Sequence, residues 1–468
     1  MISQGCKFSL TLGSNIVLAR LLTPQDYGLI GMVTVVTGFV GLFKDLGLSM
    51  ATVQKEEITH EQVSTLFWVN IALSLVTMLV AAALAPIIAS FYNEPRLIWI
   101  TLTLSAGFII SGAGVQHGAL LNRQMRFTSL VIIDLLSTTG SLIITVIVAW
   151  NGAQYWSLVW LPLSSAMIGT VGTWIACSWR PSLPKLHSGV RSMLVFGGNL
   201  TGFSIVNYFA RNADNLLIGR FWGAQQLGFY TKAYQLLVLP IQQINGPIAA
   251  VAVPALSRLQ SDPRQFRHYY LKALSFVTFL TVPIAAFLML MSEDIIILLL
   301  GSQWRAASVL FQVLSISAIV QPICNTSGWL YISTGKTKQM FKWGLFASLF
   351  VVISFLVGLP YGAQGVATCY TVVMLLQALP CMYYATRGSS ITMLDVWSAV
   401  NEPLIAALIS SLVSFGVKTK IDSNLERWET VIICFCISTT LYLIITFYLF
   451  RKKDFYLSFL NSFKQPRA

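Results

Sequence analysis

Apolar runs of membrane-spanning length follow one another along nearly the whole 468-residue chain. A helix needs about 20 apolar residues to cross the hydrocarbon core of a bilayer, and about fourteen segments meet that length. Only 10% of the residues are charged, whereas soluble domains average about 25%. The sequence therefore predicts an all-α polytopic membrane protein, with spans near residues 4–22, 27–51, 62–91, 97–121, 127–149, 155–178, 192–221, 227–256, 268–300, 306–333, 340–360, 364–386, 396–417 and 429–450.

An internal repeat divides the chain into two similar halves. NIVLARLLTPQDYGLI (15–30) and NLLIGRFWGAQQLGFY (215–230) align without a gap, with identical residues at four positions, among them Arg20/Arg220 and Gly28/Gly228. A second, shorter repeat relates WNGAQYW (150–156) to PYGAQGV (360–366), and each precedes an apolar run. Two similar halves rich in membrane-length segments are typical of transporters built from structural repeats.

The loop RPSLPKLHSGVRS (180–192) follows six predicted helices and is the natural boundary between two lobes. An even number of helices in each lobe predicts parallel repeats, related by an axis along the membrane normal. The chain begins almost inside its first apolar run, which predicts a truncated first helix. The expected organisation is an N-terminal lobe (1–179), a cytoplasmic loop (180–191), a second six-helix lobe (192–387), two additional helices (388–450) and a basic cytoplasmic tail (451–468).

Charge placement predicts the orientation. The net charge is +13, and the 30 Lys and Arg residues gather in short loops between apolar runs. With the N-terminus inside, the inner loops hold roughly three times as many basic residues as the outer loops, which predicts cytoplasmic termini. No basic patch interleaved with aromatics indicates nucleic-acid binding. The seven cysteines form no CxxC pair and the four histidines show no ligand spacing, so we expect no metal and no cofactor.

Three segments carry a resemblance to a known family: ARLLTPQDYGLIGMV (19–33), DNLLIGRFWGAQQLGFY (214–230) and PALSRLQSDP (254–263). They resemble polysaccharide flippases of the multidrug/oligosaccharidyl-lipid/polysaccharide exporter superfamily, most closely the colanic-acid and exopolysaccharide exporters. The resemblance implies two helical lobes around a central cavity. It also implies movement of polyprenyl-diphosphate-linked oligosaccharide to the periplasmic leaflet of the bacterial inner membrane. Membrane lipids, a polysaccharide polymerase and glycosyltransferases are the partners that it implies.

The seventh predicted helix carries the candidate substrate-binding residues. Ser204, Asn207, Arg211 and Asp214 fall within about 80° of arc at helical spacing, so they share one face. Charges at such depth normally face a cavity or a partner. In one interpretation Arg211 receives the diphosphate, because its guanidinium fork suits phosphate, Asp214 orients it, and Asn207 and Ser204 bind sugar hydroxyls. In the other, Arg211 and Asp214 form an internal ion pair that fixes helix packing.

Other intramembrane charges also have two interpretations. Lys232 extends a basic wall of the binding site or reaches along its stem to the outer interface. Asp134, in the fifth predicted helix, carries a coupling proton if burial raises its pKa, or makes a packing contact. Arg20 and Arg220 form a two-sided clamp over the exit or anchor their helices at the interface.

We therefore expect a transporter and no enzyme: a flippase that works by alternating access in the synthesis of exopolysaccharide, capsule or O-antigen (lipopolysaccharide). One alternative is a small-molecule or cation antiporter of the same fold, which more often relies on acidic cavity residues. Another is a membrane polysaccharide polymerase or ligase, which needs catalytic groups and usually a large outer loop. The predicted outer connections are short, which disfavours that class.

Overall fold

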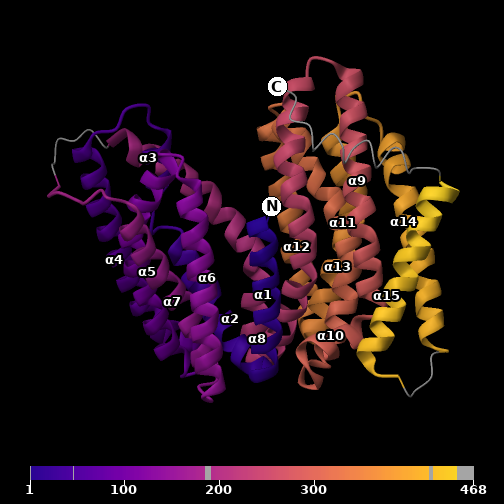
Figure 1. Cartoon of the computed structure of the whole chain (residues 1–468), viewed down its shortest axis with the longest axis horizontal. Helices are drawn as coiled ribbons and strands as arrows, with labels where there is room; N and C mark the ends of the chain where they lie inside the picture. Colours follow the sequence, from indigo (N-terminus) through magenta and orange to yellow (C-terminus); the bar gives the residue numbers. More distant parts are fainter. Residues whose placement is uncertain (1, 46, 185–190, 421–424, 451–468) are drawn as a thin grey trace. The chain divides into compact units, whose positions relative to one another are not determined.

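The computed structural model describes residues 2–45, 47–184, 191–420 and 425–450, and all regular structure in these ranges is helical (Figure 1). Within them, ten helical segments are long and apolar enough to cross a membrane by length and composition. A bilayer admits helices because every backbone hydrogen bond is satisfied within the segment. The prediction of an all-α, multi-pass membrane protein is confirmed.

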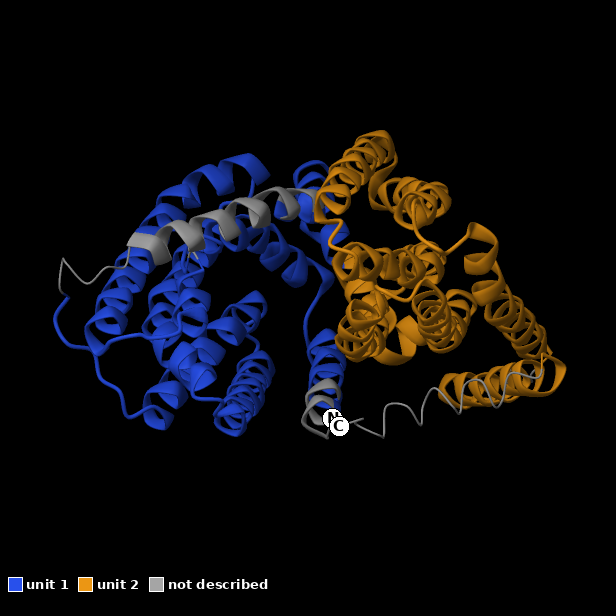
Figure 2. Ribbon diagram, turned by 90° about the horizontal axis from the view of Figure 1, so that it is seen from above, with its two compact units in different colours: residues 1–228 blue, residues 229–468 orange. Residues whose placement is uncertain are grey.

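The chain divides into two compact units, residues 1–228 and residues 229–468 (Figure 2). The boundary falls inside the long helix α8 (Arg191–Leu259). The lobe ranges expected from the sequence follow the internal repeat instead, and they stay a prediction.

Unit 1 consists of α1 to α7 and the first part of α8. Two helix starts in this unit are fixed by capping residues. Thr23 caps α2 with Pro24 in its first turn, and Thr59 with Gln62 forms a capping box at the start of α4, so amides of the first turn are satisfied. The helices before α8 are α1 (Ile2–Leu21), α2 (Pro24–Gly41), α3 (Leu48–Gln54), α4 (His60–Tyr92), α5 (Leu97–Arg123), α6 (Phe127–Trp150) and α7 (Tyr155–Ala176).

Two predicted spans are each broken into two helices. The span expected at 27–51 is wrong as one helix, because α2 ends at Gly41 and α3 begins at Leu48. Gly47 adopts a left-handed conformation with φ of 69°, which glycine tolerates and which ends a helix. The span expected at 268–300 is interrupted at Met291, where acidic residues in the next first turn favour a new helix N-terminus.

Unit 2 holds the rest of α8 and the helices up to the C-terminal end of the described chain. Asp262 caps α9, because its Oδ1 accepts hydrogen bonds from the amides of Arg264 (3.0 Å) and Gln265 (3.1 Å). These amides hold the pKa of Asp262 below its usual value. The helices are α9 (Pro263–Leu290), α10 (Ser292–Leu300), α11 (Ala307–Ser333), α12 (Thr337–Gly358), α13 (Gly362–Thr386), α14 (Met393–Lys418) and α15 (Arg427–Ile444).

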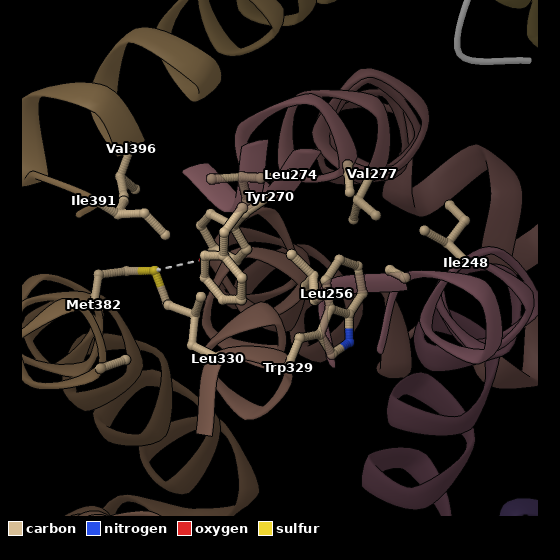
Figure 3. Close-up of a cluster of buried hydrophobic side chains, with 14 of the residues drawn as sticks. Ile248, Leu256, Tyr270, Leu274, Val277, Trp329, Leu330, Met382, Ile391 and Val396 are labelled. Carbon is tan, nitrogen blue, oxygen red and sulfur yellow. Dashed lines mark hydrogen bonds between the residues drawn. The ribbon is translucent and has the colours of Figure 1, made fainter. Parts of the chain in front are cut away.

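The core of unit 2 packs apolar side chains of α8, α9, α11, α13 and α14 around Tyr270 (Figure 3). The Tyr270 hydroxyl is fully buried and satisfied: it donates to Thr326 Oγ1 at 2.9 Å and lies 3.9 Å from the sulfur of Met382. The Thr326 hydroxyl in turn donates to the carbonyl of Ile323 at 2.7 Å. A buried hydroxyl of this kind is tolerated because its hydrogen bonds are made.

The internal repeat is visible in the backbone of each unit. α5 and α11 have the same bounds after a shift of 210 residues, and α6 and α12 begin at equivalent positions. The turns between them match as well. Met125 and Gly335, at equivalent positions, both have positive φ (54° and 70°), and so do Gly152 and Gly362 (77° and 78°). The short sequence repeat at 150–156 and 360–366 therefore corresponds to the same turn geometry in both units.

Candidate functional site

The first repeat segment packs directly against its copy within unit 1. Gly223 (φ 79°, ψ 177°) breaks α8 at the position equivalent to Thr23 between α1 and α2. Next to this break, a Cβ atom at Gly28 would overlap the backbone carbonyl of Ala224, and one at Gly228 would overlap the carbonyl of Pro24. Pro24 and Ala224 are themselves equivalent, so the contact is reciprocal. Reciprocity of this kind is the signature of a local twofold axis.

Side chains on both sides of this glycine contact tie α8 to α2 and α4. The Tyr208 hydroxyl donates to the carbonyls of Val35 (2.8 Å) and Thr34 (3.2 Å) on α2. The Arg220 guanidinium lies over the Phe91 ring, 5.4 Å from its centroid. With its amide oriented so that the oxygen faces Arg220, Asn93 accepts a 3.1 Å hydrogen bond from Nη1. Arg220 is therefore held by the end of α4.

The two charges expected on the substrate face of α8 lie in different environments. Arg211 is exposed, whereas Asp214 is only 8% exposed. Asp214 Oδ1 accepts a 2.8 Å hydrogen bond from the amide of Asn215. The side chains of Ser204 and Asn207 lie outside the described residues. The Arg211 side chain is thus exposed, while Asp214 is buried within unit 1.

The other predicted charges, Lys232 and Asp134, differ in burial. Lys232 belongs to unit 2 and is 4% exposed, so its ammonium does not reach an exposed interface. The rings of Tyr230 and Tyr234 beside it are nearly parallel, with centroids 6.4 Å apart. Asp134 is exposed on α6. Its role as a coupling group stays a prediction.

Sequence reasoning missed a buried polar cluster between α4 and α5. Asn70, Ser74, Gln116 and His117 are fully buried, and each has at least one polar atom without a hydrogen-bond partner, including both ring nitrogens of His117. The imidazole stacks on Trp174 with 4.3 Å between centroids. Gln116 Oε1 accepts from Thr52 at 2.9 Å. The spacing of Asn70 and Ser74 by four residues was the available signal, because it places them on one helix face.

A charged turn links α4 to α5. Glu94 accepts two 2.8 Å hydrogen bonds from the Nε and Nη2 atoms of Arg96. These bonds hold the pKa of Glu94 below its usual value, because they favour the ionised form. The pair is partly exposed, so it makes a modest contribution to stability. Within the described residues, no group of three His, Cys, Asp or Glu side chains has the geometry of a metal site.

Curated relatives have similar sequences over most of their length. The lipopolysaccharide biosynthesis protein WzxC of Escherichia coli is 26% identical over 413 residues, 86% of this chain and 82% of the relative. The teichuronic acid biosynthesis protein TuaB of Bacillus subtilis is 26% identical over 388 residues, 81% and 80% of the two chains. The succinoglycan biosynthesis transport protein ExoT of Rhizobium meliloti is 23% identical over 414 residues, 88% and 84%.

Solved structures share the fold. The lipid II flippase MurJ in an inward closed conformation matches with a TM-score of 0.77 at 16% identity, over 96% of this chain and 98% of that chain. A multidrug resistance transporter of the MATE family, inward-facing and assigned to the MOP superfamily, matches with a TM-score of 0.67 at 14% identity, over 84% and 96%. At these identities the likeness concerns the fold alone.

A family model described as polysaccharide biosynthesis protein matches residues 17–309, more than half of the chain. The match includes both copies of the repeat segment and α4 to α7 between them. This chain is therefore a member of the polysaccharide biosynthesis protein family, with the transporter fold seen in MurJ.

Proposed function

We propose that this protein flips polyprenyl-diphosphate-linked oligosaccharide from the cytoplasmic to the periplasmic leaflet of a bacterial inner membrane. Three observations support the proposal: membership of a polysaccharide biosynthesis family, a relative named as a transport protein for succinoglycan biosynthesis, and the fold of a lipid II flippase. Transport fits a chain that consists almost entirely of apolar helices better than catalysis does. Both termini would lie in the cytoplasm, as the basic loops indicate.

Arg211 is the observation that carries the proposal. An exposed guanidinium within a long apolar helix is expensive in lipid, so it is retained where it serves a ligand or a polar path. Its five donors, fixed in one plane, suit the oxygens of a diphosphate, and it stays protonated at every physiological pH. Asp214, Ser204, Asn207 and Lys232 would complete the binding of the diphosphate and sugars. Asp134 stays the candidate for a coupling proton, although it is exposed on α6 and so lacks the burial on which that role was predicted.

Alternating access supplies the movement in this proposal. The diphosphate and sugars would cross along polar side chains while the polyprenyl tail stays in lipid, because only the head group carries a large desolvation penalty. The lobes of the two repeats would move as rigid bodies, as in other transporters made of repeats. Glycosyltransferases that build the cargo and a polymerase that uses it are the expected partners.

Arg211→Ala tests the head-group role. Loss of a charge-assisted hydrogen bond removes about 1.5–3 kcal/mol, so we expect surface polysaccharide to fall about tenfold or more at matched expression. Arg211→Lys should retain part of the activity, since it keeps the charge. Arg427→Ala, which removes an exposed arginine at the start of α15, is the charge-matched control and should have no effect. Full surface polysaccharide in the Arg211→Ala strain would exclude the proposed role.

A further inference from the structure

A basic patch lies at one end of unit 2, where α12 begins and α13 ends. We call it the basic rim and define it as Lys336, Lys338, Lys342 and Arg387. Lys336 Nζ donates to the carbonyls of Arg387 (3.3 Å) and Gly388 (3.4 Å), so the turn after α13 is held beside the start of α12. The four cations are therefore gathered by the fold, although Arg387 is distant from the others in sequence.

The basic rim has no acidic counterpart on its own helices. Residues 295–394, which include α11, α12 and α13, contain no Asp or Glu. The nearest acidic side chain on the neighbouring helix α14 is Asp395, and it pairs with Arg267 of α9. Charges gathered without internal neutralisation attract an anionic partner from outside the chain.

The rim continues into an exposed apolar stripe along α12. Lys338, Lys342, Leu345 and Leu349 are spaced by four, three and four residues and so share one helix face. Leu345 and Leu349 are 43% and 59% exposed, and the stripe extends through Ile353 and Leu356. On the neighbouring helix α13, Tyr383, Leu379 and Leu376 are 63% to 69% exposed. Lys338 and Lys342 thus lie at one end of an exposed apolar surface that is suited to acyl chains.

The start of α12 adds unpaired donors. Lys336 occupies the N-cap position of α12 without a side-chain cap hydrogen bond, in contrast to Thr23, Thr59 and Thr392 at other helix starts. Amides of an uncapped first turn and the positive end of the helix dipole favour an anion there.

We propose that the basic rim and the apolar stripe of α12 form a binding site for an anionic phospholipid of the surrounding membrane. Lys338 and Lys342 bind the head-group phosphate, Lys336 and Arg387 complete the positive surface, and an acyl chain lies along Leu345, Leu349 and Ile353. Basic clusters beside a membrane-spanning helix recognise anionic head groups in this way. The site lies within unit 2 and does not depend on the proposed transport activity.

The positive-inside rule alone accounts for basic loops, but it does not account for this placement. In unit 1 the equivalent positions of Lys338 and Lys342 are Thr128 and Ile132, and that of Arg387 is Cys177. The equivalent helix α6 has an exposed apolar surface as well, with Ile132, Leu136 and Ile143 more than 50% exposed. The combination of lysines and an apolar stripe is therefore particular to the second repeat.

Lipid titration of the full-length protein in detergent tests the site. Native mass spectrometry would measure the phospholipid retained with phosphatidylglycerol, phosphatidylcholine or inorganic phosphate as the added probe. We expect retention of phosphatidylglycerol by the wild type and about thirtyfold weaker retention by Lys338→Gln/Lys342→Gln, since each lysine near an anionic head group contributes about 1 kcal/mol. Lys338→Arg/Lys342→Arg should restore binding. Phosphatidylcholine and inorganic phosphate should bind weakly to all variants.

Arg258→Gln/Arg264→Gln is the matched control, because it removes two cations that belong to the end of α8 and the start of α9 and not to the basic rim or the α12 stripe. It should retain phosphatidylglycerol as the wild type does. Equal retention by the Lys338→Gln/Lys342→Gln variant and the wild type would overturn the site. So would equal losses in the control, which would indicate a diffuse charge effect, or exclusive retention of a polyprenyl diphosphate, which would indicate a substrate site.

Discussion

Helices α5 to α7 of unit 1 and α11 to α13 of unit 2 have the same turns but different side chains between them. In unit 1, His117 and Gln116 are buried with unsatisfied polar atoms. At the equivalent positions of unit 2, Ser327 and Thr326 are buried, and Thr326 is hydrogen-bonded to Tyr270 and Ile323. The comparison teaches that positive-φ turns and helix lengths preserve the repeat, while the polar contents of the two cores have diverged.

The same divergence is found in the contact that joins the start of α6 to the end of α7, and in the equivalent contact between α12 and α13. We call these contacts the hairpin clamps. Arg126 precedes α6, and its Nη1 donates to the carbonyl of Ala176 at the end of α7 at 2.9 Å. Lys336 occupies the equivalent position before α12 and donates to the turn after α13 at 3.3 Å. A cation closes the hairpin in both repeats, but only in unit 2 do further lysines follow on the exposed face of the helix.

The largest expected effect concerns the contact between the two copies of the repeat segment. Gly28→Leu and Gly228→Leu should each destabilise the protein by about 3 kcal/mol or more, because a side chain would overlap backbone that cannot move as a flexible side chain does. The midpoint of thermal unfolding in detergent measures this. Gly13→Leu is the control, since no atom lies within 4 Å of a Cβ there. Clearly unequal effects of the two substitutions would contradict the reciprocity of the contact.

The next prediction contrasts the two cores. Thr326→Val should lower the free energy of unfolding by about 1–2 kcal/mol, because it leaves the buried Tyr270 hydroxyl with a weaker partner. His117→Phe should cost less, since the ring nitrogens lie near the Ala113 and Trp179 backbone without a well-formed hydrogen bond to lose. Chemical denaturation of each variant under one set of conditions compares them. A larger loss of unfolding free energy for His117→Phe than for Thr326→Val would contradict the proposed difference between the two cores.

The hairpin clamps should differ by a smaller amount. Arg126→Ala should lower stability by about 1 kcal/mol, and Lys336→Ala by about half of that, because both contacts are exposed and the lysine bonds are longer. The measurement is again the thermal midpoint, here in a zwitterionic detergent without added lipid so that the basic rim is empty in every sample. Equal effects would show that the two clamps are interchangeable despite their geometry.

The smallest expected effect is a pH dependence confined to the turn after α4 in unit 1. Because its folded-state pKa is depressed, ionised Glu94 stabilises the fold above its unfolded pKa, and this stability is lost as the pH falls through the folded pKa. At neutral pH, the free energy of unfolding of the wild type should exceed that of Glu94→Gln by less than about 1 kcal/mol. The gap should close below about pH 4, near the ordinary Glu value. If this difference in unfolding free energy persists below about pH 4, the ion pair with Arg96 is not its cause.

Much of the fold could be predicted from hydrophobic pattern, but the packing could not. The succession of apolar helices and the caps at Thr59 and Asp262 are local properties, so the sequence indicates them. The breaks at Gly47 and Met291 were missed, although charged residues lie beside both: Lys44 and Asp45 before Gly47, and Glu293 and Asp294 after Met291. Of the candidate site, the sequence indicates that Arg211 and Asp214 share a face. It does not indicate that one is exposed and the other buried, nor that Gly28 meets Ala224, because both depend on tertiary contacts.

The distribution of lipid-linked oligosaccharide between the two leaflets tests the transport function most directly. A strain that lacks this chain and its complemented counterpart would be compared by treating intact spheroplasts with an impermeant reagent that modifies the glycan. The account predicts that cargo accumulates in the protected, cytoplasmic leaflet of the deletion strain and becomes accessible on complementation. Equal accessibility in both strains, with normal amounts of cargo, would contradict it.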